Sequence, residues 1–140
     1  MVLVDTSVWS LGLRRQLRDL TPLQKRLRSE LYDLIASGRA RMLGAVRQEI
    51  LSGVREDAHF RRLRDDLRMF LDVSLAAEDY EEAARIYNAC RASGIAGSGT
   101  DYLLCAVALL RNWEIFTLDR DFEHYAKAVK VRLYQPRHAN

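Results

Sequence analysis

The chain has 140 residues, of which 49% are hydrophobic and 29% are charged, and its formal net charge is +3. This length fits one domain, and the apolar content and balanced charge exclude an intrinsically disordered chain. Two cysteines are too few for a disulfide scaffold, and the longest uninterrupted apolar run, residues 102–110, is much shorter than the roughly 20 residues that span a membrane.

The basic residues are mainly arginines and are concentrated in the first half of the chain. Arginine favours bidentate contacts with phosphate, so this distribution is compatible with nucleic-acid binding. The N-terminal residues lack the basic segment and apolar stretch of a secretory signal. We therefore expect a cytoplasmic protein without membrane contact, folded as one domain over residues 1–140 with its core over 2–133 and a tail over 134–140.

The first half of the chain alternates short apolar runs with segments of helical periodicity. The expected elements are a strand over 1–4, a helix over 20–35, a strand over 40–43, a short helix over 45–53 and a helix over 57–71. Asp5, Thr6 and Ser7 follow the first strand and predict a turn or a helix cap. Thr21 and Pro22 are typical of an N-cap and a first helical position.

The second half continues the alternation. The expected elements are a brief strand over 72–75, a helix over 77–92, a loop of small residues over 93–99, a helix over 101–110, a strand over 114–117, a helix over 121–127 and a strand over 129–133. Thr100 is the expected N-cap of the helix over 101–110. This helix is apolar on nearly all sides and therefore belongs in the interior. Helices alternating with short strands predict an α/β domain with a central, mostly parallel sheet of four to five short strands.

Acidic residues follow several of the expected strands. Asp5 comes directly after the first strand, Glu49 lies on the helix after the second, and Asp101 opens the buried helix. Asp119 and Asp121 follow the strand over 114–117. A parallel sheet gathers such groups at its carboxyl edge, where carboxylates repel one another unless a cation neutralises them. Oxygen-only ligands suit Mg²⁺ or Mn²⁺.

Each of these acids also has an ordinary structural interpretation. Asp5 is a common turn residue, and Asp101 favours the positive end of a helix dipole. Glu49 is compatible with a solvated helix face, and Asp119 or Asp121 with the cap of the next helix. The prediction of a site therefore depends on the whole set and on its placement.

Four segments carry a resemblance to a known family; they are residues 4–9, 48–53, 100–108 and 117–122. In this order they resemble a PIN domain, and more narrowly the VapC-type toxins of bacterial toxin–antitoxin pairs, over about residues 2–133. The resemblance implies a three-layer fold with helices on both faces of the sheet. It also implies an Mg²⁺- or Mn²⁺-dependent ribonuclease that is often a homodimer and is inhibited by a cognate antitoxin protein filling the acidic groove.

The resemblance implies that Asp5, Glu49, Asp101 and Asp119 are the catalytic acids and hold the metal, with Asp121 as the second choice for the fourth position. We expect Asp5 and Asp101 to be the principal ligands and Glu49 and Asp119 to complete the cluster and orient the water. Hydrolysis of RNA would then leave a 5′-phosphate and a 3′-hydroxyl, because the 2′-hydroxyl is not the nucleophile.

Other residues are expected to support the acids or to bind substrate. The resemblance implies small polar supports beside the acids, which are Thr6, Ser7 and Thr117. Arg14 and Arg15 are candidates for contact with the RNA backbone. Trp9 is a candidate for stacking on a base, although a place in the core or at a dimer interface is the commoner use of such a residue.

Two alternatives to an RNA-cleaving toxin stay open at this point. One is a DNA-directed nuclease with the same acidic architecture, which the sequence does not distinguish from a ribonuclease. The other is a non-catalytic module that binds RNA or an antitoxin, which would be expected to have lost one of the acids. The chain has no Cys/His zinc pattern and no phosphate-binding glycine motif that would favour other chemistry.

Overall fold

The computed structural model describes residues 1–137, and the part of the expected tail over 138–140 lies outside the described residues. Its central sheet has four strands in this described part of the chain, all parallel, in the order β2-β1-β3-β4. The strands are β1 (Val2–Val4), β2 (Ala40–Arg41), β3 (Glu114–Phe116) and β4 (Arg132–Leu133). The expected α/β fold with a parallel sheet is confirmed, with four strands and not five.

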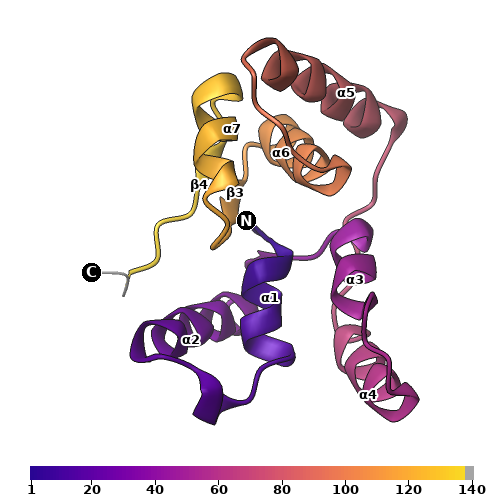
Figure 1. Ribbon diagram of the computed structural model, residues 1–140, viewed down its shortest axis with the longest axis vertical. Helices are drawn as coiled ribbons and strands as arrows, with labels where there is room; N and C mark the ends of the chain where they lie inside the picture. Colours follow the sequence, from indigo (N-terminus) through magenta and orange to yellow (C-terminus); the bar gives the residue numbers. More distant parts are fainter. Residues whose placement is uncertain (138–140) are drawn as a thin grey trace.

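The helices cover both faces of this sheet. Figure 1 shows one group, α1 to α4, in the lower part of the view and a second group, α5 to α7, in the upper part, with the strands between them. The bounds are α1 (Thr6–Leu13), α2 (Pro22–Ala36), α3 (Gly44–Leu51), α4 (Asp57–Leu67), α5 (Ala77–Ala92), α6 (Gly99–Arg111) and α7 (Asp121–Val129), with a 3₁₀ turn, η1 (Leu17–Asp19), between α1 and α2. The three-layer architecture expected from the resemblance is therefore present.

The inner strands, β1 and β3, are paired in a register that places Asp5 at the carboxyl edge of the sheet. Val2 lies opposite Glu114 and Val4 opposite Phe116. The backbone N–H of Asp5 extends the pairing by donating to the Phe116 carbonyl at 2.9 Å. Because the two strands are parallel, the residues that follow them, Asp5 and Thr117, leave the sheet side by side.

Several helix ends follow directly from local chemistry. The Thr21 hydroxyl accepts from the backbone N–H of Gln24 at 3.2 Å, and the Gln24 side chain accepts from the N–H of Thr21 at 3.0 Å, which is a complete capping box. After α2, Gly38 adopts a φ of +69°, a conformation that glycine takes without strain. The predicted bounds of α5, residues 77–92, match the structure.

Other predicted boundaries are wrong. The segment after Asp5 is a helix, α1, that was not predicted, although Asp5 stands at its N-cap, as one of the two interpretations of residues 5–7 expected. Ser98 and not Thr100 caps α6, because the Ser98 hydroxyl accepts from the backbone N–H of Asp101 at 3.2 Å. The strand expected over 72–75 is a single parallel bridge between Met42 and Asp72.

The core lies between the sheet and the two helix layers. All residues of α6 from Tyr102 to Ala108 are buried, as the apolar pattern predicted. Both cysteines are buried free thiols. Among the helices of the described chain, none combines the length and apolar composition needed to cross a membrane.

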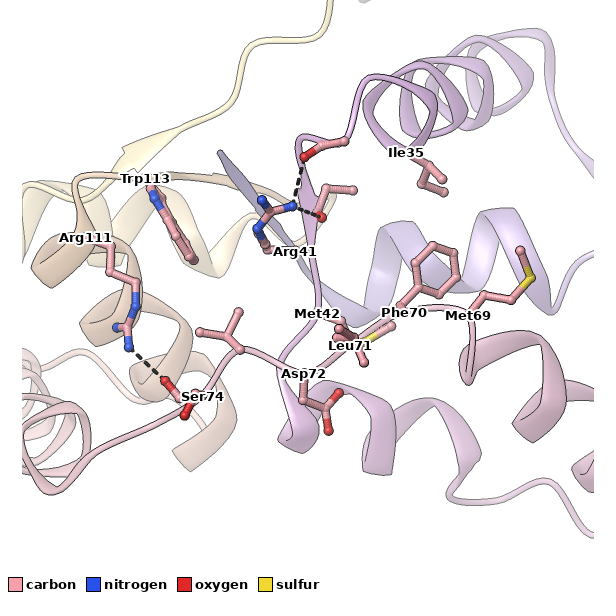
Figure 2. A pocket seen from close by; sticks show the side chains of 13 residues that line it. Ile35, Arg41, Met42, Met69, Phe70, Leu71, Asp72, Ser74, Arg111 and Trp113 are labelled. Carbon is pink, nitrogen blue, oxygen red and sulfur yellow. Dashed lines mark hydrogen bonds between the residues drawn. The ribbon is translucent and has the colours of Figure 1, made fainter.

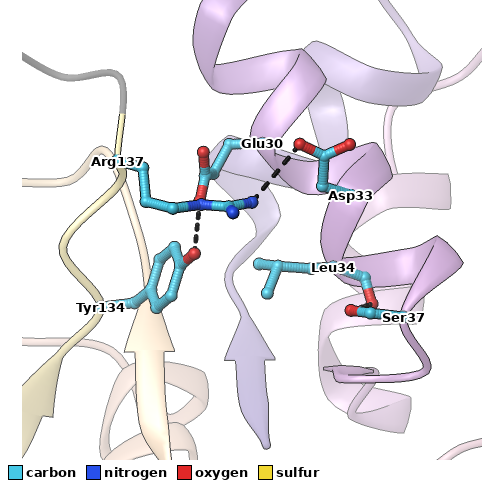
Figure 3. Close-up of polar contacts among 6 residues, drawn as sticks. All are labelled: Glu30, Asp33, Leu34, Ser37, Tyr134 and Arg137. Carbon is cyan, nitrogen blue, oxygen red and sulfur yellow. Dashed lines mark hydrogen bonds and ion pairs between the residues drawn. The ribbon is translucent and has the colours of Figure 1, made fainter.

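The segment after β4 is attached to α2. Figure 3 shows Tyr134 and Arg137 pointing toward the buried carboxylate of Glu30. The Tyr134 hydroxyl donates to Glu30, and the Arg137 Nε lies 3.2 Å from the same oxygen. The described part of the expected tail therefore packs against the domain.

Candidate active site

Asp5 is the most enclosed acid at the carboxyl edge of the sheet, with a side chain that is 5% exposed. The hydroxyls of Ser7 and Thr117 both donate to its Oδ2, each at 2.8 Å. Backbone N–H groups occupy the acceptor sides of these hydroxyls: Leu118 donates to Ser7 Oγ and Asp119 donates to Thr117 Oγ1, each at 3.0 Å. This arrangement directs both hydroxyl protons to the Asp5 carboxylate.

The donors around Asp5 are all neutral. Within residues 1–137, no lysine or arginine lies at ion-pair distance from Asp5. Burial therefore raises the pKa of Asp5 above its ordinary value, although the hydrogen bonds from Ser7 and Thr117 act in the opposite direction. The carboxylate is held in place without being neutralised.

Asp101 joins this site from the first turn of α6. Tyr125 on α7 donates its hydroxyl proton to Asp101 Oδ2 at 2.8 Å. Burial raises the pKa of Asp101, the hydrogen bond from Tyr125 lowers it, and the negative charge of Asp5 raises it further. The fold thus brings Asp5 and Asp101, which are far apart in the sequence, close enough for their charges to repel.

Glu49 approaches from α3 and is exposed. Its Oε2 accepts a hydrogen bond of 2.6 Å from the hydroxyl of Thr6, the residue that follows Asp5. Glu49 is therefore linked to the Asp5 region from a third element, although its carboxylate stays at the surface.

Asp119 lies in the turn between β3 and α7, Asp121 is the first residue of α7, and both are exposed. Asp119 Oδ1 accepts from the backbone N–H of Asp121 at 2.9 Å. The Asp119 carboxylate thus stabilises the turn into α7, and its connection to Asp5 passes through its backbone N–H and Thr117. The choice between the two aspartates as fourth acid stays a prediction.

The donor set at this edge is made of oxygen atoms only. In the part of the chain that the structure describes, no group of three or more His, Cys, Asp or Glu side chains lies close enough to hold a metal ion together. Mg²⁺ is usually bound by one or two carboxylates and keeps several waters. Asp5 and Asp101, which repel each other and pair with no lysine or arginine of residues 1–137, fit that requirement.

Tyr125 and Ser98 are site residues that sequence reasoning missed. Tyr125 lies three residues after Phe122, and both are buried, so their spacing indicates only the inner face of α7. Ser98 precedes α6 and contacts Asp101 through the cap. The Ser98 contact is local and is typical of an N-cap serine, whereas the contact of Tyr125 with Asp101 forms only when α6 and α7 are packed together.

The candidates for substrate contact have different surroundings. Trp9 is fully buried and packs against Phe70 with ring centroids 4.8 Å apart, so it occupies the core, the commoner use expected for it, and its ring is not open to a base. Arg14 and Arg15 are exposed at the far end of α1. Since α1 has eight residues, these arginines lie about 12 Å along the helix from its start beside Asp5. They are close to Asp5 in the sequence but not in contact with it.

A large hollow of the surface lies beside the edge strand β2 (Figure 2). Its volume is about 740 Å³, and none of the five candidate acids lines it. Met69 and Leu71, which line it, are 80% and 90% exposed. Arg41 closes part of the strand edge by donating to the carbonyls of Gly38 and Ala40, each at 2.9 Å. We call this hollow the β2 groove.

The sequence matches the family model for the PIN domain over residues 2–128. The chain belongs to the PIN-domain family. PIN domains are in general nucleases that act on phosphodiester bonds, and they usually use divalent metals. No curated protein matches the chain by sequence.

Solved structures share this PIN fold at low sequence identity. FitAcB from Neisseria gonorrhoeae is 19% identical, with a TM-score of 0.75 over 99% of both chains. VapBC2 from Rickettsia felis, bound to a DNA fragment from its promoter, is 12% identical, with a TM-score of 0.69 over 96% of this chain and 98% of that one. A toxin–antitoxin complex from Klebsiella pneumoniae is 14% identical, with a TM-score of 0.65 over 97% of this chain and 98% of that one.

Proposed function

We propose that this PIN domain is a divalent-metal-dependent endoribonuclease that acts as the toxin of a toxin–antitoxin pair. The observation that carries the proposal is the buried Asp5 carboxylate, which has only neutral donors and lies within electrostatic reach of Asp101. A buried acid without a cationic partner destabilises a fold. Its retention beside a second acid is explained by a cation that binds there during function.

The acids divide into two roles in this proposal. Asp5 and Asp101 hold Mg²⁺ or Mn²⁺, and Ser7, Thr117 and Tyr125 fix the orientation of their carboxylates. The ion supplies a water of lowered pKa and stabilises negative charge on the phosphate. Thr6 holds Glu49 at the mouth of the site.

The remaining roles concern water and substrate. Glu49, together with Asp119 or Asp121, accepts hydrogen bonds from the attacking water and keeps it on one side of the phosphate. Arg14 and Arg15 contact the RNA backbone some distance from the scissile bond.

The test is cleavage of matched single-stranded RNA and DNA by the wild type, Asp5→Asn and Asp101→Asn, with Mg²⁺, Mn²⁺ or a chelator. We expect RNA cleavage that falls on the order of 10²–10³-fold in either variant, a loss typical of removing a charge-stabilising group. Asp57→Asn, which changes an exposed acid on α4, is the matched control. Full cleavage by Asp5→Asn, or by the wild type in chelator, would contradict the proposal, and preferential cleavage of DNA would favour the DNA-directed alternative.

We also propose a cognate antitoxin as the protein partner. The FitAcB, VapBC2 and Klebsiella structures support it, since the last is a toxin–antitoxin complex of the same fold. Expression of the chain should arrest growth, and coexpression of a small protein encoded beside it should relieve the arrest. Arrest by Asp5→Asn at the wild-type level would show that toxicity does not depend on the acids.

The β2 groove is the surface we propose for an apolar segment of that antitoxin. Met69 and Leu71 expose large apolar side chains there, which an apolar segment of a partner would cover. Leu71→Asp should weaken capture of the antitoxin without changing RNA cleavage. Homodimer formation, which we also propose, is measured by light scattering of the same purified protein.

A further inference from the structure

A second hollow lies close to the acids, between the end of α5 and the loop that follows it. Its volume is about 310 Å³. Tyr87, Arg91 and Tyr102 line it together with residues 94–97. None of these side chains takes part in the proposed function described above. We call this hollow the α5 pocket.

The walls of the α5 pocket combine an aromatic ring with a guanidinium group. Tyr87 is 43% exposed, and its ring meets that of Tyr102 edge-on, with centroids 5.6 Å apart. Arg91 donates to the Tyr87 hydroxyl at 2.9 Å, which holds the two side chains together. Within residues 1–137, no carboxylate pairs with Arg91, so its charge is available to a ligand.

The loop at the base of the α5 pocket also touches the support of Asp101. A Cβ atom at Gly97 would overlap the Tyr125 hydroxyl and would lie 2.8 Å from the Tyr102 hydroxyl. The absence of a side chain therefore lets the loop lie against the hydroxyl that donates to Asp101. The pocket is thus linked to the Asp101 carboxylate through Gly97, which lies against the Tyr125 hydroxyl.

Local hydrogen bonds shape this loop. Gly94 adopts a φ of +72° directly after α5, and its N–H donates to the Arg91 carbonyl at 3.0 Å. The N–H of Ile95 donates to the Cys90 carbonyl at 2.8 Å. These bonds end the helix in the way that glycine-terminated helices commonly end, and they define the rim of the pocket.

Charge distinguishes the α5 pocket from the hollow at the other end of the same helix. The residues that line that other hollow are Glu78, Glu81, Glu82 and Arg85. Three glutamates repel phosphate, whereas Arg91 attracts it. Of these two ends of α5, the one where Arg91 lies is therefore the more favourable for a polyanionic strand.

We propose that the α5 pocket binds one nucleotide of the single-stranded RNA substrate, next to the cleaved bond. The base packs against the Tyr87 ring, and Arg91 binds the adjacent phosphate. Proteins recognise unpaired RNA through such stacking on aromatic and guanidinium groups. The pocket thereby selects the sequence at which RNA is cut. This inference rests on the proposed ribonuclease function.

The test compares Tyr87→Ala, Tyr87→Phe and Arg91→Ala with two controls on the same helix, Tyr80→Ala and Arg85→Ala. Both control residues are exposed and lie outside the pocket. We expect Tyr87→Ala and Arg91→Ala to raise KM about tenfold with kcat unchanged, since a stacked base contributes about that much to affinity. Sequencing of the cut ends should show a broader set of cleavage sites. Tyr87→Phe keeps the ring but removes the hydroxyl that Arg91 contacts, so its KM should lie closer to the wild type than that of Tyr87→Ala.

A direct binding measurement separates this inference from the proposed function. Labelled single-stranded RNA is titrated into Asp5→Asn and into Asp5→Asn with Tyr87→Ala, where cleavage does not interfere. Weaker binding by the second protein supports the pocket, and equal binding overturns it. Unchanged KM and cut sites in both Tyr87→Ala and Arg91→Ala, with Asp5→Asn inactive, would overturn the pocket while the ribonuclease function stands. Wild-type activity in Asp5→Asn would instead overturn the function.

Discussion

Two regions of this molecule bury a carboxylate, and they differ in the charge of the groups that donate hydrogen bonds to it. In the outer layer, Asp79 on α5 accepts two hydrogen bonds from Arg111, the shorter at 2.6 Å, and its Oδ2 also accepts from the backbone N–H of Ala76. At the carboxyl edge of the sheet, Asp5 receives two hydrogen bonds from neutral hydroxyls. Both side chains are almost fully buried.

The pKa values of the two acids are shifted in opposite directions. The hydrogen bonds from the Arg111 guanidinium lower the pKa of Asp79, whereas burial raises the pKa of Asp5. Glu30 resembles Asp79: burial alone would raise its pKa, but hydrogen bonds from Tyr134 and Arg137 outweigh burial and lower it. The comparison separates two acids that have arginine partners from Asp5, which has none among residues 1–137 and which we propose binds a metal ion.

The largest expected effect on stability is at the Asp79 pair. Arg111→Met leaves Asp79 buried without its cation and should lower the free energy of unfolding by about 3 kcal/mol. Chemical denaturation measures the change. Arg85→Met removes an exposed ion pair with Glu82 and should change stability by less than about 0.5 kcal/mol. Equal losses in the two variants would contradict the distinction between a structural pair and a surface pair.

A smaller effect is expected from the hydroxyl that orients Asp101. Tyr125→Phe should weaken Mn²⁺ binding roughly tenfold, because partners that orient metal ligands commonly contribute that much to affinity. Isothermal titration calorimetry gives the affinity directly. Tyr102→Phe, which removes a buried hydroxyl beside the same loop, is the control and should bind Mn²⁺ like the wild type. Loss of affinity in both variants would indicate a general packing defect.

The two buried aspartates should respond to amide substitution with opposite signs. In chelator at neutral pH, Asp5→Asn should raise the free energy of unfolding by about 1 kcal/mol, because it removes a buried charge while the amide oxygen still accepts hydrogen bonds. Asp79→Asn should lower it. Thermal melts of both variants without metal measure the two changes in stability. Destabilisation of the protein by both substitutions would contradict the prediction.

The pH dependence of the Asp79 pair is the smallest effect. Its folded pKa is lowered, so its stabilising contribution is complete above the unfolded value near 3.8 and is lost as the pH falls through the folded pKa. Acid titration of the wild type and Arg111→Met should therefore converge below about pH 4. A stability difference that stays constant down to pH 2 would show that the pair is not the cause.

The sequence was informative where the chemistry is local. Thr21 and Pro22 predicted the start of α2, and the alternation of strands and helices predicted the parallel sheet, which is why acids as distant as Asp5 and Asp101 were expected together. The α1 helix was missed because it has only eight residues and contains Gly12, a poor helix former, so its apolar spacing is too short to indicate a helix. The prediction therefore failed where an element is short.

Contacts that depend on packing were not predictable. Tyr125 reaches Asp101 from another helix, and the α5 pocket forms where Tyr87 meets the loop that ends α5. Asp119 was preferred as the fourth acid because it is near the end of a strand, yet its carboxylate holds the turn into α7. Proximity in sequence does not specify the direction of a side chain.

The most direct test of the central claim is the change in melting temperature on adding Mn²⁺ to metal-free protein. An ion shared by Asp5 and Asp101 binds only the folded state, so it should stabilise the wild type by an amount that grows with its concentration. We predict a much smaller shift for Asp5→Asn and a wild-type shift for the control Asp57→Asn. Equal shifts in all three proteins would contradict a metal site at Asp5.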